Sequence, residues 1–260
     1  RELEDKSRSL EQATAELRQA NEQLKSLDRL KDDFMSSVTH ELRTPLTSIR
    51  ALAELMRDDV NMAPAQRQQF TAIIVAETER LSRLVNQVLD LAKIESGNAE
   101  WHNSEVDMGA LLRQAVATTA ELFHERQCAV ELHLPPQVRL LRADPDRLTQ
   151  VVLNLLSNAA KFVPVPGGRV VVSLARDVSG LTVRVQDNGP GVPPEQQGLI
   201  FERFRQGGDG ISRPQGTGLG LPISRQIVEH FGGRLWLEAG SGEGACFSFY
   251  LPWAAPVPLP

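Results

Sequence analysis

Cysteine and aromatic residues are scarce in this sequence. Its 260 residues include only two cysteines, Cys128 and Cys246, and their spacing matches neither a metal site nor a redox pair. We therefore expect a reduced setting in which both are small core residues. Aromatic residues make up 5% of the chain, so its core must be mainly aliphatic.

Long apolar runs and a strong net charge are also missing. No stretch approaches the ~18–20 apolar residues that span a bilayer, and no signal peptide is visible. The formal net charge of −5 argues against nucleic acid as a partner. Because the chain begins without Met inside a helical pattern, we expect a fragment of a longer protein. The reduced setting expected from the cysteines makes this fragment cytoplasmic. Membrane attachment of the full-length protein is left open.

Leucines recur every seven residues in the first part of the chain, at Leu3, Leu10, Leu17 and Leu24. Three positions further on, the d positions hold Lys6, Ala13, Ala20, Leu27 and Phe34. This pattern predicts a parallel coiled coil over residues 1–33, and hence a dimer. The alternative is one amphipathic helix packed against another domain.

A helical hairpin is expected over residues 34–97. The first helix continues to about Asp59, with Pro45 as a kink, and the second runs from about Ala65 to Ser96 before Gly97. Both helices have an apolar stripe. Doubling the hairpin would bury the stripes in a dimeric four-helix bundle.

The composition changes near residue 100, where strand-like runs alternate with helices. Strands are predicted near 101–106, 128–134, 138–142, 169–176, 180–187, 234–239 and 244–251, and helices near 108–126, 145–162 and 218–231. These elements predict an α/β sandwich with a mixed, mostly antiparallel sheet over residues 100–252. The proline-rich tail, 253–260, is expected to be disordered.

One histidine, His40, lies on the outward side of the first helix. Val38 and Leu42 are each about 200° around the helix from it and should point into the core. Glu41 follows directly, and Thr44 lies one turn on. A solvated surface histidine is the simple alternative, so this group must be weighed with the rest of the chain.

A polar stripe follows in the helix at 145–162. Asn154, Asn158 and Lys161 are spaced at i, i+4 and i+7, so they share one face of an otherwise apolar helix. Two amides and an ammonium there need partners. Mg²⁺ with phosphate oxygens would supply them, since magnesium takes oxygen ligands and keeps several waters. A solvated helix face is the alternative.

Two glycine-rich loops complete the set. The loop 187–191 follows a strand, and its acid, Asp187, could accept a hydrogen bond from an exocyclic amine, while the glycines let a flat ring approach. The loop 216–221 opens a helix and would offer free N–H groups to phosphates. The polar segment 205–215 before it is interpreted as a mobile lid, anchored at its base by Phe201 and Phe204.

Together these segments resemble the sensor histidine kinases of two-component systems. Five blocks occur in that family's order: the phosphoacceptor box (40–46), the N box (154–162), the first glycine box (187–191), the F box (200–204) and the second glycine box (216–221). Each block is weak to moderate by itself, but all five in order are very specific. The resemblance implies a dimerisation and phosphotransfer domain followed by a Bergerat-type ATP-binding domain.

The resemblance also implies roles for individual residues. His40 would be the phosphorylated nucleophile, Glu41 its adjacent base, and Thr44 the residue that positions water. Asn158 would bind Mg²⁺. ATP would be bound by Asn154, Asn158, Lys161, Phe162, Asp187, Gly189, Gly191, Gly216, Thr217, Gly218, Leu219 and Gly220.

The implied function is an ATP-dependent histidine autokinase. It would pass the phosphoryl group from His40 to an aspartate on the receiver domain of a response regulator, and would also have phosphatase activity. The implied partners are a second copy of the chain, that regulator and an upstream sensor domain.

Two alternatives remain. One is a nucleotide-binding regulator without kinase output. The other is a different ATPase of the same superfamily, but such ATPases place a glutamate where Asn154 stands and lack a helical His-Glu box.

Overall fold

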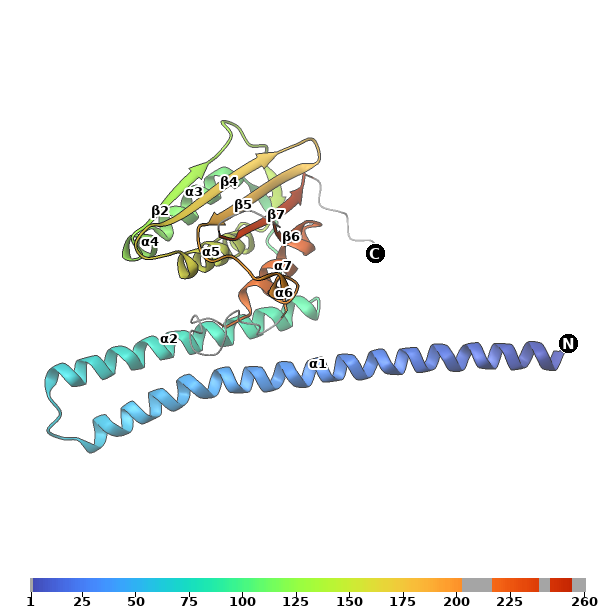
Figure 1. Ribbon diagram of the computed structural model, residues 1–260, viewed down its shortest axis with the longest axis horizontal. Coiled ribbons are helices and arrows are strands. Elements are labelled where there is room, and N and C mark those ends of the chain that lie inside the picture. Colours follow the sequence, from blue (N-terminus) through green and yellow to red (C-terminus); the bar gives the residue numbers. More distant parts are fainter. Residues whose placement is uncertain (1, 203–216, 239–243, 254–260) are drawn as a thin grey trace. The chain divides into compact units, whose positions relative to one another are not determined.

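The computed structural model describes residues 2–202, 217–238 and 244–253 (Figure 1). The chain divides into two compact units, residues 1–84 and 85–260. No helix in the described part of the chain is long and apolar enough to cross a membrane.

The first unit is a helical hairpin. Helix α1 (Glu2–Asp58) runs unbroken through Pro45, and α2 (Pro64–Glu95) returns beside it (Figure 1). The two expected helices are confirmed within two residues at their ends. Pro45 is buried, as is Val38, whereas Leu42 is half-buried.

The end of α2 explains why the helix stops there. Gly97 adopts a positive φ of 71°. Its N–H donates to the Ile94 carbonyl and the Asn98 N–H donates to the Lys93 carbonyl, at 3.1 and 2.9 Å. This pair of bonds is a Schellman motif, which glycine permits at low cost.

The second unit begins with the last turns of α2. Leu91 is fully buried there. The Asp90 carboxylate forms an ion pair with Arg147 Nη1 at 3.0 Å and accepts a hydrogen bond from the Gln150 side chain at 3.1 Å. These contacts fix the C-terminal end of α2 within the second unit.

The rest of the second unit is an α/β sandwich, as expected. Its elements are β1 (Ser104–Val106), α3 (Met108–Thr118), α4 (Ala120–Glu125), β2 (Cys128–His133), β3 (Leu141–Ala143), α5 (Pro145–Phe162), β4 (Gly168–Arg176), β5 (Gly180–Asp187), α6 (Pro194–Gln197), α7 (Gly220–His230), β6 (Arg234–Leu237) and β7 (Cys246–Pro252).

The main sheet has five strands in the order β2-β4-β5-β7-β6. Strands β2 and β4 are parallel and the other neighbours are antiparallel, so the mixed, mostly antiparallel prediction is confirmed. Strands β1 and β3 form a separate antiparallel pair. Buried and exposed residues largely alternate along β4 and β5, so one face of the sheet supplies the core.

Some details differ from the prediction. The helix expected over 108–126 is two helices, because the backbone leaves helical geometry at Thr119, with φ −94° and ψ 3°. The short helix α6 was not predicted. Of the two cysteines expected in the core, Cys246 is buried but Cys128 is only half-buried.

The predictions for the two ends of the chain are tested only in part. Trp253, expected in the disordered tail, donates from its ring nitrogen to the Asp177 carbonyl at 2.9 Å. Residues 254–260 lie outside the described residues, and the coiled coil at 1–33 and the domain boundary at 97–100 stay predictions.

Candidate functional site

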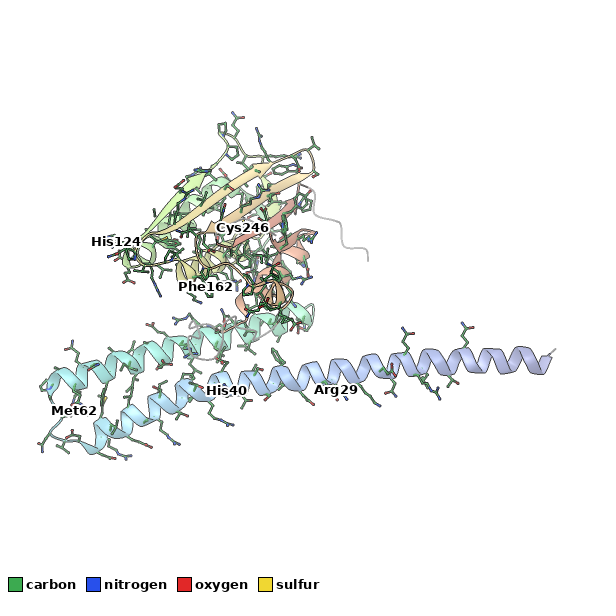
Figure 2. The ribbon with its side chains drawn as sticks, in the orientation of Figure 1. Arg29, His40, Met62, His124, Phe162 and Cys246 are labelled. Carbon is green, nitrogen blue, oxygen red and sulfur yellow. The ribbon has the colours of Figure 1, made fainter. Side chains whose placement is uncertain are left out.

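His40 lies on α1 with 70% of its side chain exposed (Figure 2). Its Nδ1 is 3.9 Å from Oε1 of Glu41, which is longer than a hydrogen bond. Because Glu41 is the next residue along the helix, its carboxylate reaches the ring from the side. The other ring nitrogen, Nε2, is the one left for a reacting partner.

Thr44 is tied to the same turn of α1. Its hydroxyl donates to the His40 carbonyl at 3.2 Å, the usual i−4 bond of a threonine in a helix. Thr44 is exposed, so the hydroxyl oxygen stays accessible one turn from the imidazole. The i, i+4 placement expected from the sequence is therefore confirmed.

A residue that the sequence reasoning missed contacts Glu41. Arg80 of α2 donates from Nη2 to Glu41 Oε2 at 3.4 Å. Its separation of 39 residues from Glu41 leaves no local pattern that could have pointed to it.

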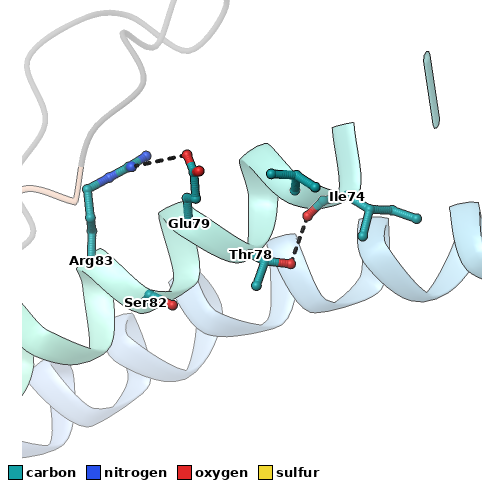
Figure 3. A pocket seen from close by; sticks show the side chains of 6 residues that line it. Ile74, Thr78, Glu79, Ser82 and Arg83 are labelled. Carbon is teal, nitrogen blue, oxygen red and sulfur yellow. Dashed lines mark hydrogen bonds and ion pairs between the residues drawn. The ribbon is translucent and has the colours of Figure 1, made fainter. Parts of the chain in front are cut away.

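A shallow hollow also lies on α2, lined by Ile74, Val75, Thr78, Glu79, Ser82 and Arg83 (Figure 3). It holds none of the predicted site residues. Within it, Arg83 Nη1 lies 3.9 Å from the Glu79 carboxylate, and both side chains are 65% exposed. We assign no ligand to this hollow.

The predicted polar stripe lies on α5 as expected. Asp144 caps the helix by accepting from the N–H groups of Asp146 and Arg147, and Pro145 is its first residue. Asn154, Asn158 and Lys161 are all half-buried on the face they share. The amides and the ammonium can therefore meet both the protein and a bound molecule.

Asn154 is fixed against the start of α7. Its Nδ2 donates to the hydroxyl of Ser224, a residue only 1% exposed, at 2.8 Å. A Cβ added at Gly220 would collide with the Asn154 amide. Glycine at 220 thus allows the second glycine loop to pass directly over α5. Ser224 was not predicted as a site residue.

Asp187 is 5% exposed at the end of β5. Its Oδ1 accepts from the N–H groups of Gly189 at 2.8 Å and of Ala245 at 3.2 Å. Burial raises the pKa of this carboxyl above its ordinary value, and the two hydrogen bonds work in the opposite direction. Asp187 is therefore an oriented, partly desolvated acceptor.

Glycines surround Asp187 because the backbone is crowded there. A Cβ at Gly189 would lie 2.6 Å from the Phe162 carbonyl, so the loop meets the C-terminal end of α5. Gly191 has a φ of 76°. Gly244, which the sequence analysis placed at the start of the strand 244–251 and not in the site, has a φ of 90° and packs on the backbone of Asp187.

The second glycine loop is described from Thr217 onward. The Thr217 hydroxyl donates to Gln87 Oε1 at 2.6 Å and accepts from the Leu219 N–H at 3.3 Å. Leu219 is fully buried, and Gly218 has a φ of 67°. Helix α7 begins at Gly220, two residues later than expected. Gly216 lies outside the described residues.

The F box is described only in part. Phe201 packs edge-on against Phe247 of β7, with ring centroids 6.4 Å apart, and Arg225 of α7 lies over its ring. This contact fits the expected anchor at the base of the lid. Phe204 and the predicted lid, 205–215, lie outside the described residues.

Helix α5 therefore brings the candidate nucleotide-binding residues together. Asn154 contacts the start of α7, and the backbone carbonyl of Phe162, at the C-terminal end of α5, meets the loop after Asp187. Phe162 is 41% exposed. His40, Glu41 and Thr44 belong to the other compact unit.

Comparison with known proteins matches both units to families. Residues 30–97 match the His Kinase A (phospho-acceptor) domain, and residues 143–255 match the histidine kinase-, DNA gyrase B- and HSP90-like ATPase family.

Individual relatives agree with these matches. The chain is 37% identical over 252 residues to sensor histidine kinase AruS of Pseudomonas aeruginosa, covering 95% of this chain and 25% of AruS. Full-length ShkA, solved in complex with AMPPNP, is 30% identical with a TM-score of 0.63, covering 87% of this chain and 47% of ShkA.

The structure of the mycobacterial sensor histidine kinase MprB is 32% identical with a TM-score of 0.50, covering 59% of this chain and 99% of that one. The chain spans only a quarter of AruS, so the activity of the whole protein is a separate question. From the two matched domains and these relatives, the chain belongs to the sensor histidine kinases of two-component systems.

Proposed function

We propose that this chain is an ATP-dependent histidine autokinase that phosphorylates His40 and passes the phosphoryl group to an aspartate of a response regulator. The observation that supports this most is the exposed imidazole of His40 with a carboxylate beside its Nδ1. A chain with that arrangement and an ATPase-family domain holds both a nucleophile and a phosphoryl donor site.

The chemistry follows from the two ring nitrogens. A neutral imidazole with its proton on Nδ1 has a lone pair on Nε2, which attacks the γ-phosphorus of ATP. The N–P bond forms, the bond to the bridging oxygen breaks, and ADP leaves. Glu41 takes the Nδ1 proton as positive charge develops on the ring. Phosphoryl transfer needs mainly positioning and charge neutralisation.

Nucleotide recognition would use the second unit. Both hydrogen bonds to Asp187 fall on Oδ1, so Oδ2 can accept from the adenine amine. Gly189 and Gly191 would shape the adenine pocket beside Phe162. Lys161 and the loop Gly216–Gly220 would contact the phosphates, at the N-terminal end of α7.

Magnesium fits the residues present. The described residues contain no group of three His, Cys, Asp or Glu side chains that could hold a metal. Asn158, half-buried on α5, would give one amide oxygen while ATP gives phosphate oxygens. The bound cation would neutralise charge on the transferring phosphate.

The partners are proposed on similar grounds. The hairpin leaves large apolar side chains exposed, including Leu46, Leu55 and Val75, which a second copy would cover in a four-helix bundle. A response-regulator receiver domain would dock near His40. An upstream sensor would act through the coiled coil, and this part of the chain would work in the cytoplasm, where ATP is available.

Phosphatase activity is proposed as the second output. The exposed Thr44 hydroxyl would orient water for hydrolysis of the regulator's phosphoaspartate. Thr44→Ala is expected to slow that hydrolysis while His40 labelling continues.

Labelling with γ-³²P-ATP tests the main proposal. The chain should acquire an acid-labile, base-stable label, and His40→Gln should remain unlabelled while binding nucleotide normally. A label that persists in His40→Gln would refute the assignment. ATP binding without any label would favour a regulator without kinase output, and steady hydrolysis independent of His40 would favour another ATPase of the superfamily.

A further inference from the structure

Three charged side chains meet inside the helical hairpin beside His40. The Arg80 guanidinium donates from Nη2 to Glu41 Oε2 at 3.4 Å, and its Nη1 is 3.7 Å from Glu77 Oε2. The side chains of Arg80, Glu41 and Glu77 are only 24%, 20% and 18% exposed. Glu77 Oε2 is buried without a hydrogen bond, so the Arg80 cation is what offsets its charge.

This cluster differs from an exposed ion pair on the same helix. Arg83 and Glu79, one turn further along α2, are each 65% exposed and 3.9 Å apart. Exposed pairs of that kind are screened by water and contribute little. The half-buried Arg80 cluster is screened less, and it joins α2 to α1 where Glu41 is located.

The two oxygens of Glu41 have different neighbours. Oε2 faces Arg80, and Oε1 faces Nδ1 of His40 at 3.9 Å. A glutamate next to its histidine in a helix must reach sideways, and a free side chain of this length would sample several rotamers. A bond on Oε2 restricts those rotamers to ones that keep Oε1 on the imidazole side.

From this geometry we propose that Arg80 is a positioning residue for histidine phosphorylation, which holds the Glu41 carboxylate so that Oε1 can receive the Nδ1 proton. The inference rests on the proposed role of Glu41 as the base. In this proposal Arg80 acts through Glu41, the carboxylate that its Nη2 contacts.

Arginine suits this position better than lysine. The guanidinium has several donors in a planar fork, so it can face Glu41 with one nitrogen and Glu77 with the other. A lysine at 80 would keep the charge but could not span both carboxylates in the same way. Arg80→Lys should therefore have an activity between those of wild type and Arg80→Gln.

A double-mutant cycle on the full chain tests the proposal. The initial rate of His40 labelling is measured for wild type, Glu41→Gln, Arg80→Gln and the double variant. We expect about a 100-fold loss for Glu41→Gln, the lower end for general-base catalysis. We expect roughly tenfold for Arg80→Gln, since misplacing a catalytic group by an ångström can lower the rate substantially.

The double variant separates positioning from a structural role. If Arg80 acts through Glu41, the double variant labels as slowly as Glu41→Gln alone, and the KM for ATP is unchanged in all four. Arg83→Gln is the matched control on the same helix and should label at the wild-type rate.

Each contrary result has a distinct meaning. Losses that multiply in the double variant, a wild-type rate in Arg80→Gln, or a raised KM for ATP would overturn the role of Arg80. If circular dichroism shows that Arg80→Gln does not fold, Arg80→Lys takes its place in the cycle. A wild-type labelling rate in Arg80→Lys would then overturn the proposal. A rate that Arg80→Lys lowers when Glu41 is present, but not in the Glu41→Gln background, would support it. A wild-type rate in Glu41→Gln, or no label on wild type, would instead overturn the proposed function.

Discussion

Replacing Gly220 by alanine tests whether close packing or helix propensity governs the second glycine loop. Gly220 is the first residue of α7, and alanine is the better helix former by up to about 1 kcal/mol. Propensity alone therefore predicts a more stable protein. The structure predicts the opposite, because the new Cβ would collide with the amide of Asn154.

The amide of Asn154 has little freedom to move away. Its bond to Ser224 is 2.8 Å long, and Ser224 is buried. Overpacking typically destabilises by about 1–3 kcal/mol, and loss of the hydrogen bond adds about 1 kcal/mol. After subtracting the propensity gain, we expect Gly220→Ala to lower the free energy of unfolding by about 1–3 kcal/mol.

Calorimetry of the full chain measures this change. About 2 kcal/mol corresponds to a fall of roughly 4–8 °C in the Tm of a unit of this size. Gly198→Ala is the matched control, since a Cβ at Gly198 meets nothing within 4 Å. A Tm for Gly220→Ala equal to or above that of wild type would refute the packing argument.

Three further predictions concern the nucleotide site and the stacked pair Trp101 and His230. Burial raises the pKa of Asp187, so this carboxylate is protonated at a higher pH than an ordinary carboxyl and then no longer accepts a hydrogen bond from adenine. The affinity for ADP, measured by fluorescence, should therefore fall as the pH drops toward about 4. Asp187→Asn should bind ADP weakly at every pH, without the fall seen in wild type. A pH profile identical to that of wild type would contradict the role of Asp187. Asn158→Ala should abolish labelling of His40 while light scattering still finds a dimer; dissociation would argue against the proposed domain split. Trp101 stacks on His230 with ring centroids 3.7 Å apart, and burial lowers the pKa of His230, so the folded state binds that proton less readily than the unfolded state. Stability should therefore fall as the pH drops below about 6.5, the ordinary histidine value, and Trp101→Ala should reduce this slope in urea titrations at pH 5 and 7; an unchanged slope would show that the stack does not control it.

Periodicity was enough to predict the faces of single elements. The i, i+4, i+7 spacing of Asn154, Asn158 and Lys161 gave the polar face of α5, and Asp144 with Pro145 gave its start. Local chemistry also predicted the end of α2 at Gly97, because a left-handed residue after a helix favours glycine. At Thr119 the predicted continuous helix over 108–126 was wrong, because the backbone leaves helical geometry there and nothing in the local pattern indicated the break.

The sequence by itself therefore determined the elements, the faces of the helices and the residue types of both candidate sites, since these depend on neighbours within a turn or two. Only the tertiary structure decided the strand order, the bond from Asn154 to Ser224, the packing of Gly244 on Asp187 and the contact of Arg80 with Glu41. The partners in these contacts are separated by 39 to 70 residues. Such contacts form when whole helices and strands pack together. The local periodicity of the sequence does not specify which of these elements will be neighbours.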